Sequence, residues 1–222
     1  MILAVAFAPA CKKETFGSRS DPDVVEAGAR VNGRTYAEWS AAWWQFVLSF
    51  PVSTSPLCRD DNCDTGQSGP VWFLAGKWGD SPVVAVRRCN IPAGKYVFFP
   101  VVNIMANNEG YVPPKTVEEL RAAAREQIDS CTARCWFDGR ELAGPELLQR
   151  VVSPVFRYKL PAGNFWKVPA GTLVDPVVSD GMWVMLKPPA AGNHVIRFTA
   201  SSGVAAYAFD ITYQIEVAAP VK

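Results

Sequence analysis

The stretch Tyr36–Pro51, with the sequence YAEWSAAWWQFVLSFP, decides how the rest of this chain must fold. It holds three of the eight tryptophans, and its aromatic residues recur at the three- and four-residue spacing of an α-helix. Thr35 and Glu38 stand at capping-box spacing, which predicts a helix that begins at Tyr36 and that Pro51 ends. Such a broad aromatic stripe needs a large apolar surface, so we expect it to be buried against a sheet. The stripe consists of Tyr36, Trp39, Trp43, Phe46 and Phe50.

A second face of the same helix is smaller and more polar. Glu38 and Gln45 lie on it, with Ala41 and Ala42 between them. This pattern predicts either a close packing seam or one wall of a groove. Capping accounts for Glu38, whereas Gln45 stands among aromatic residues without a packing role. We therefore expect any function of this helix on the face from Glu38 to Gln45.

Beyond Pro70 the chain alternates short apolar runs with turn residues. The whole chain contains eighteen prolines and sixteen glycines, spread among such runs in a way that is typical of a β-rich domain. The last run, Tyr207–Val217, alternates strictly between apolar and polar residues, as a half-buried strand does. A second helix is predicted after the capping box of Thr116 and Glu119. The sequence therefore predicts a mainly β protein, an antiparallel β-sandwich of jelly-roll type with two helices on or beside it, in a single domain over residues 23–222.

Several element boundaries follow from turn residues. A short strand is expected at Val24–Gly33 and an unbroken strand at Arg150–Leu160. The dipeptide Asp180–Gly181 is a favoured turn, so we expect it to separate two strands. Pro100 interrupts an apolar strand and predicts a bulge or a sheet edge. The other expected strands are Val71–Ala75, Val83–Cys89, Lys95–Val102, Ala133–Asp138, Leu173–Val178, Met182–Lys187 and His194–Ala200.

Charge and the first residues bear on location and partners. The chain of 222 residues has a net charge of +1 without long runs of either sign, which argues against nucleic acid as a partner. The apolar residues 1–10 precede Cys11 and a polar stretch, and together they look like the end of a bacterial lipoprotein signal. We expect residues 1–22 to be a signal segment and tether, with Cys11 acylated as the only link to a membrane and the protein exported to the cell envelope or secreted.

Six cysteines in an exported chain favour disulfides. Cys63 and Cys89 flank two neighbouring predicted strands, so we expect a bridge between them. Cys131 and Cys135 are a second candidate pair at the expected end of the second helix. Cys58 is then left for Cys11, or unpaired if Cys11 is acylated. The alternative is a zinc site built from the two closely spaced cysteine pairs.

Four segments together resemble a family of exported bacterial proteins of uncharacterised function. They read YAEWSAAWWQF, GQSGPVWFLAG, CNIPAGKYVFFPVVN and DGMWVML. The resemblance spans about residues 36–217 and implies export and a single domain, with no activity to carry over. Cys63 and Cys89 fall in the family-like part, whereas Cys58, Cys131 and Cys135 look like additions.

Three residues are candidates for catalysis. His194 is the single histidine and could act as a general base. A serine hydrolase would pair it with Ser68, but Pro70 stands where the nucleophile-elbow pattern needs glycine. A glycosidase would need two carboxylates beside a groove, and Glu38 and Asp180 are the candidates. Capping of the helix by Glu38 and a turn at Asp180 are the alternative structural roles.

Asp60, Asn62 and Asp64 alternate like the start of a calcium loop. Thr65 stands where an EF-hand needs glycine, and the glutamate that closes such a loop is missing. An irregular calcium site is therefore the only cofactor that the sequence indicates.

The aromatic surplus is the last lead. Trp72 and Trp183 lie in apolar strands and are expected in the core, whereas Trp78 and Trp166 lie beside Gly or Lys and are expected to be exposed. Sugar-binding sandwiches stack pyranose rings on exposed tryptophans. We therefore predict an exported protein that binds a ligand outside the cytoplasm, with a carbohydrate as first candidate and contacts from Gln45, Trp78, Asn103 and Trp166. A glycosidase using Glu38 with Asp180 or His194, and a structural envelope protein, are the alternatives.

Overall fold

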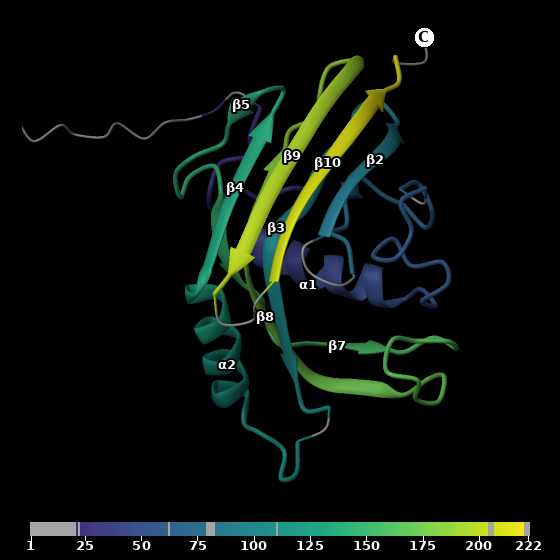
Figure 1. Ribbon diagram of the computed structural model, residues 1–222, viewed down its shortest axis with the longest axis vertical. Helices are drawn as coiled ribbons and strands as arrows, with labels where there is room; N and C mark the ends of the chain where they lie inside the picture. Colours follow the sequence, from purple (N-terminus) through teal and green to yellow (C-terminus); the bar gives the residue numbers. More distant parts are fainter. Residues whose placement is uncertain are drawn as a thin grey trace, which may run out of the picture.

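The computed structural model describes residues 21, 23–61, 63–78, 83–109, 111–203 and 207–219, and it consists of two helices and two five-stranded sheets (Figure 1). The helices are α1 (Tyr36–Leu48) and α2 (Val117–Asp129). The first sheet contains β1 (Val71–Phe73), β3 (Tyr96–Asn107), β8 (Leu173–Leu186), β6 (Gln149–Val152) and β7 (Phe156–Lys159). The second sheet contains β2 (Val83–Ile91), β10 (Tyr207–Val217), β9 (Gly192–Ser202), β4 (Cys131–Phe137) and β5 (Arg140–Glu141).

The two sheets share one apolar core, which makes the fold sandwich-like and confirms the mainly β prediction. Phe99 of β3 and Phe198 of β9 stack across this core with ring centroids 5.5 Å apart. The predicted alternation of β10 is present, with Ile211, Tyr213 and Ile215 buried on one face. Figure 1 shows β2, β10, β9 and β4 in front of β3 and β8.

Helix α1 covers the other face of the first sheet, as its aromatic stripe predicts. Its capping box is complete, with Thr35 and Glu38 each accepting a backbone N–H of the other. Trp43 is 1% exposed, and its ring lies 5.5 Å from that of Trp183, which stacks on Phe98 at 4.9 Å. The helix therefore belongs to a second core that it shares with the sheet.

Two of the predicted strands differ from those observed because tertiary contacts override local turn signals. Strand β8 runs without a break through Asp180–Gly181, so the turn predicted there is wrong. A Cβ on Gly181 would lie 2.7 Å from the carbonyl oxygen of Val102, so glycine serves a close approach to β3. The strand expected at Arg150–Leu160 is divided into β6 and β7, which both pair with β8.

Three further differences concern the edges of the sheets. The segment expected as a strand at Val24–Gly33 makes only isolated bridges, at Val24 and Val31. The sandwich is not antiparallel throughout, because β1 runs parallel to β3 and β2 parallel to β10. The bulge predicted at Pro100 is confirmed, since the register of β3 against β8 shifts between Pro100 and Val102.

The cysteines follow the prediction in part. The disulfide Cys63–Cys89 is present and ties the long loop after α1 to β2. Cys131 and Cys135 are both free, so the second bridge is wrong. They lie in strand β4 and not at a helix end, and an extended strand separates residues four apart by about 13 Å. Cys58 is free as well, and Cys11 lies outside the described residues. None of the helices in the described part of the chain is long and apolar enough to span a membrane.

Candidate functional site

A cavity of about 250 Å³ opens where α1, the middle of β3 and the start of β10 meet. We call it the Trp44 cavity. Its walls are mostly apolar, because aromatic residues of α1 and β10 face the aliphatic residues of β3. The residues that line it are Trp43, Trp44, Leu57, Gly76, Lys77, Trp78, Val83, Pro100, Val101, Val102, Asn103, Ile104, Tyr207, Ala208 and Phe209.

Two of the lining side chains carry buried hydrogen-bond donors without a partner. The indole Nε1 of Trp44 and the amide Nδ2 of Asn103 are both inaccessible and unpaired. Trp44 as a residue is only 8% exposed. An unpaired buried donor costs about 1–3 kcal/mol, so folded proteins keep few of them. Both atoms belong to residues that line one cavity, where a ligand can supply the missing acceptors once the side chains that cover the two donors move aside.

The edge of β3 forms the floor of the Trp44 cavity. β1 pairs with β3 only as far as Phe98, so in the described part of the chain no strand covers this edge from Pro100 onward. Five consecutive residues, Pro100–Ile104, line the cavity. The side chains of a strand alternate between its two faces, so an unbroken run of lining residues indicates that the strand is approached along its edge. Pro100 suits this position, because it lacks the N–H that a ladder needs.

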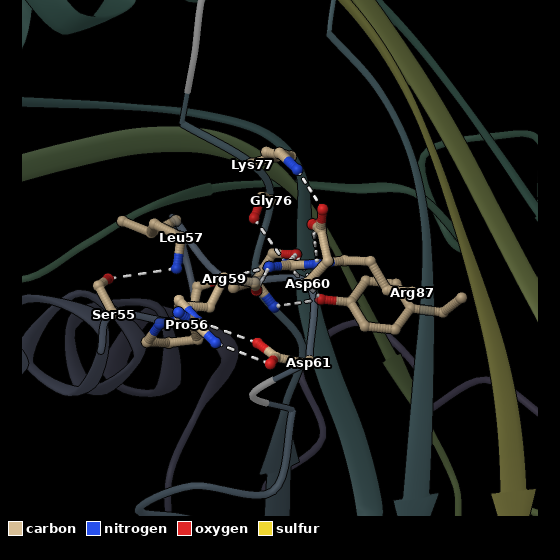
Figure 2. Close-up of polar contacts among 11 residues, drawn as sticks. Ser55, Pro56, Leu57, Arg59, Asp60, Asp61, Gly76, Lys77 and Arg87 are labelled. Atoms are coloured by element: carbon tan, nitrogen blue, oxygen red, sulfur yellow. Dashed lines mark hydrogen bonds and ion pairs between the residues drawn. The ribbon is translucent and has the colours of Figure 1, made fainter. Parts of the chain in front are cut away.

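The wall after β1 is fixed from behind by a buried arginine (Figure 2). Arg87 of β2 is 3% exposed and donates to the carbonyl oxygens of Ala75 at 3.0 Å and Gly76 at 2.9 Å. It also donates to Tyr213 Oη at 2.8 Å, and Tyr213 in turn donates to the carbonyl oxygen of Ala75 at 2.7 Å. Trp43 Nε1 donates to the carbonyl oxygen of Leu74 at 2.9 Å. The backbone that follows β1, from Leu74 to Gly76, is therefore held by three side chains, those of Trp43, Arg87 and Tyr213, each of which donates to it.

The same arginine pins the long loop between α1 and β1. Its guanidinium donates to the carbonyl oxygens of Pro56, at 2.5 Å, and Arg59. Asp60 forms ion pairs with Arg87, at 3.2 Å, and with Lys77, and Figure 2 shows it between these two cations. This loop is therefore anchored at Pro56, Arg59 and Asp60.

This arrangement bears on the predicted calcium site. The carboxylate of Asp60 is already shared between two cations, Lys77 and Arg87. Asp64 is exposed, and Asn62 lies outside the described residues. In the described part of the chain no group of three or more His, Cys, Asp or Glu residues could hold a metal ion. Calcium therefore stays a prediction from the sequence.

Three of the four predicted ligand-binding residues come together. Asn103 and Trp78 both line the Trp44 cavity. Trp78 is 62% exposed, as predicted, and its ring lies 5.3 Å from that of Phe165. Phe165 lies beside Trp166, with ring centroids 6.2 Å apart. Trp72 and Trp183 are buried, which confirms their assignment to the core.

Gln45, the fourth predicted ligand contact, has a structural partner. Its side-chain amide donates to the carbonyl oxygen of Arg157 in β7 at 2.9 Å. The residue is exposed, and it ties α1 to the short strand that leads toward Trp166. The polar face of α1 is therefore a seam with β7 at this position.

Glu38 is committed to the helix terminus. Its carboxylate accepts the Thr35 backbone N–H at 2.7 Å, and this hydrogen bond, with that from the Thr35 hydroxyl, lowers the pKa of Glu38 below its usual value. A glycosidase acid needs the opposite shift, so that the carboxyl stays protonated near neutral pH.

Asp180 and His194 are also committed to local partners. Asp180 is 3% exposed and accepts two hydrogen bonds from Arg150, at 3.1 and 2.8 Å. His194 Nδ1 lies 2.7 Å from Asp138 Oδ2, and its Nε2 lies 2.9 Å from the carbonyl oxygen of Ala190. Burial lowers the pKa of His194, but the hydrogen bonds to Asp138 and Ala190 outweigh it and leave the pKa raised.

The three predicted catalytic side chains belong to different elements. Glu38 lies on α1, Asp180 on β8 of the first sheet and His194 on β9 of the second sheet. In the described part of the chain, none of the hydrogen bonds and ion pairs of these side chains joins any two of them. None of them lines the Trp44 cavity.

The sequence interpretation missed Trp44, the residue most central to the cavity. Adjacent helix positions point about 100° apart, yet Trp43 and Trp44 are both buried in the core that α1 shares with the sheet, with ring centroids 5.1 Å apart, so the sequence pattern did not single out Trp44. It also assigned Tyr207 and Phe209 to the core face of their strand, whereas both line the cavity and are only partly buried.

Comparisons with known proteins leave the function open. No protein-family model and no curated protein matches this chain. Matching solved structures include a chain from "Structure of PbICP-C in complex with falcipain-2", with 10% identity and a TM-score of 0.31 over 68% of this chain and 100% of that chain. Another is "Crystal structure of the cysteine protease inhibitor, EhICP2, from Entamoeba histolytica", with 10% identity and a TM-score of 0.22 over 61% of this chain and 96% of that chain. Likeness at this level carries no argument about this protein.

Proposed function

We propose that this protein is a binding protein that takes a small ligand, with a carbohydrate ring as first candidate, into the Trp44 cavity. The observation that carries the proposal is the pair of unpaired donors, Trp44 Nε1 and Asn103 Nδ2, beside a cavity with aromatic walls. The ligand must present acceptor oxygens to these two donors and an apolar face to the walls.

A pyranose ring meets both demands. Its hydroxyl and ring oxygens accept hydrogen bonds, and its C–H faces pack on aromatic rings. The cavity, at about 250 Å³, is a little smaller than the sites of about 300–1,000 Å³ that hold drug-sized ligands. One ring therefore suits it better than a large cofactor.

Two further points support a role outside the cytoplasm. The Cys63–Cys89 disulfide fits an oxidising compartment, and the apolar segment before Cys11 predicts export. The proposal needs only two facing sheets and α1, so it does not depend on the predicted jelly-roll connectivity. The hydrolase and structural-envelope alternatives remain predictions that no contact of the described residues favours.

The test is a titration with glucose, galactose, mannose and N-acetylglucosamine, followed by tryptophan fluorescence and calorimetry. We expect at least one sugar to bind, and Trp44→Phe to weaken it about tenfold or more, because a lost hydrogen bond of about 1.4 kcal/mol corresponds to that factor. Asn103→Leu is expected to act in the same direction.

Trp72→Phe is the matched control. Trp72 also carries a buried, unpaired Nε1, but it lies in the sandwich core and does not line the Trp44 cavity. Equal losses in Trp44→Phe and Trp72→Phe would refute the assignment of the cavity as the site. Absence of binding to these sugars, both as single rings and as oligomers, would refute the carbohydrate class.

A further inference from the structure

We infer that the ligand is a chain of several sugar rings, with its terminal ring in the Trp44 cavity and the following rings lying along a row of aromatic side chains outside it. This inference rests on the proposed function and deepens it. The aromatic row consists of Trp78, Phe165 and Trp166.

The aromatic row is continuous with the cavity through Trp78. Trp78 lines the cavity and also lies 5.3 Å from Phe165, measured between ring centroids. The row continues to Trp166 at 6.2 Å, and Trp166 packs in turn on the buried Tyr158 at 6.0 Å. A ligand that leaves the cavity past Trp78 therefore meets further ring faces.

Trp78 is not explained by packing of the core. It is 62% exposed and belongs to none of the buried hydrophobic clusters in the described part of the chain. Phe165 and Trp166 are only partly buried, against the core that α1 shares with the sheet. Large aromatic residues gathered at an exposed site beside a cavity are typical of a binding surface.

The aromatic row is held in place before any ligand arrives. The buried Asn164 donates to the carbonyl oxygens of Pro161 at 2.9 Å and Val168 at 2.7 Å, and accepts from the Trp166 backbone N–H at 3.2 Å. The Trp78 backbone N–H donates to the carbonyl oxygen of Leu57 at 2.7 Å. Such preorganisation lowers the entropy that binding must overcome.

The two parts of the site offer different chemistry. The cavity end supplies the unpaired donors of Trp44 and Asn103, whereas the row supplies ring faces. Lys77 also lines the cavity, and it forms an ion pair with Asp60, which pairs with Arg87 as well. The cavity therefore selects a ring that carries acceptor oxygens, and the row adds stacking that grows with the length of the chain.

The test is an affinity series at increasing chain length. The probes are glucose with its β-1,4 oligomers, N-acetylglucosamine with its β-1,4 oligomers, and mannose with its α-linked oligomers, each from one to six units. We expect affinity to rise at least tenfold from one unit to four. We expect Trp166→Ala to remove that rise while leaving the affinity for one unit unchanged, whereas Trp44→Phe weakens every length.

Trp136→Ala serves as the control, because Trp136 is a partly buried tryptophan on β4 of the second sheet and lines neither part of the site. Circular dichroism checks that each variant is folded, and Phe165→Ala replaces Trp166→Ala if the latter is not. Equal affinity at every length overturns this inference and leaves the proposed function intact. Absence of binding at every length overturns both.

Discussion

The buried polar atoms around Arg87 and those beside the Trp44 cavity are neighbours, because Arg87 holds Gly76 and Gly76 lines the cavity. They differ in whether their hydrogen-bond donors have partners. Around Arg87 every donor that the guanidinium offers is used, on carbonyl oxygens, Tyr213 and Asp60. Beside the Trp44 cavity, Trp44 Nε1 and Asn103 Nδ2 are left unpaired. Buried polar groups that are all hydrogen-bonded, which form a satisfied network, stabilise the fold. A buried donor without a partner destabilises it, and a ligand that supplies the acceptor gains that free energy as binding affinity.

The largest effect is expected where the satisfied network loses its centre. Arg87→Met leaves the carbonyl oxygens of Gly76 and Pro56 without the guanidinium that donates to them, leaves that of Ala75 with Tyr213 alone, and leaves Asp60 with one cation fewer. We expect a loss of about 3–5 kcal/mol in the free energy of unfolding, measured by urea denaturation. Arg88→Met, on the exposed face of the same strand, is the control and should cost less than about 0.5 kcal/mol. Similar losses in the two variants would break the comparison.

Gly181 of β8 lies against Val102 and Asn103 of β3, which both line the Trp44 cavity. A Cβ there would lie 2.7 Å from the carbonyl oxygen of Val102 and 2.8 Å from the Cβ of Asn103. Gly181→Ala is therefore expected to cost about 1–3 kcal/mol in thermal or urea unfolding, and to weaken ligand binding by displacing Asn103. Gly203→Ala, where nothing lies within 4 Å, should leave both unchanged. A Gly181→Ala variant with the stability and the ligand affinity of wild type would show that β3 and β8 are not so closely packed.

Removing one hydroxyl from the satisfied network gives a smaller test. Tyr213→Phe keeps the ring but leaves the Ala75 backbone N–H, 3.2 Å away, without its acceptor. We expect a loss of about 1–3 kcal/mol in the free energy of unfolding. A neutral Tyr213→Phe would show that the hydroxyl contributes nothing to the stability of the satisfied network.

The pair of His194 and Asp138 tests a satisfied contact nearer the surface. The pKa of His194 is raised in the folded protein, so its stabilising effect is full below the unfolded value of about 6.5 and is lost as pH rises through the folded value. We expect wild type to exceed Asp138→Asn in stability by up to about 1 kcal/mol at pH 5 and by less at pH 9. The same comparison in a His194→Gln background should show no pH dependence, and a larger difference at pH 9 would contradict the assignment.

The smallest effect on stability is expected at the cavity. Trp44→Phe removes an unpaired donor, and relief from its desolvation offsets the loss of apolar contact, so we expect the free energy of unfolding to change by less than about 1 kcal/mol. Binding of the sugar should weaken all the same. A large loss of stability would show that Nε1 has a structural partner.

Much of the fold was predictable because its signals are local. Helix α1 has both halves of its capping box, and β10 has strict alternation, and both are as expected. The continuous strand through Asp180–Gly181 was not predictable in this way, because the hydrogen bonds from Arg150 to Asp180 and the close approach of Val102 to Gly181 come from distant parts of the chain.

The sequence indicated which types of residue would form the candidate site. It did not indicate which of their side chains would have hydrogen-bond partners. Trp78 and Trp166 were expected to be exposed, and of the two only Trp78 is, because Trp166 is partly buried against the core. Asn103 lies in β3 and lines the same cavity as Trp78. That Trp44 lacks a partner while Trp43 has one depends on where the carbonyl oxygen of Leu74 lies. Glu38 and His194 have the chemistry of catalytic residues, but local hydrogen bonds occupy them.

The most direct test follows the indole N–H signals of the tryptophans by ¹H–¹⁵N NMR during a titration with a bound sugar. The Trp44 signal is identified by its loss in Trp44→Phe and the Trp72 signal by its loss in Trp72→Phe. We predict that the Trp44 signal moves downfield as the ligand oxygen becomes its acceptor, while the Trp72 signal stays in place. A Trp44 signal that stays in place at saturation would contradict the claim that this cavity is the binding site.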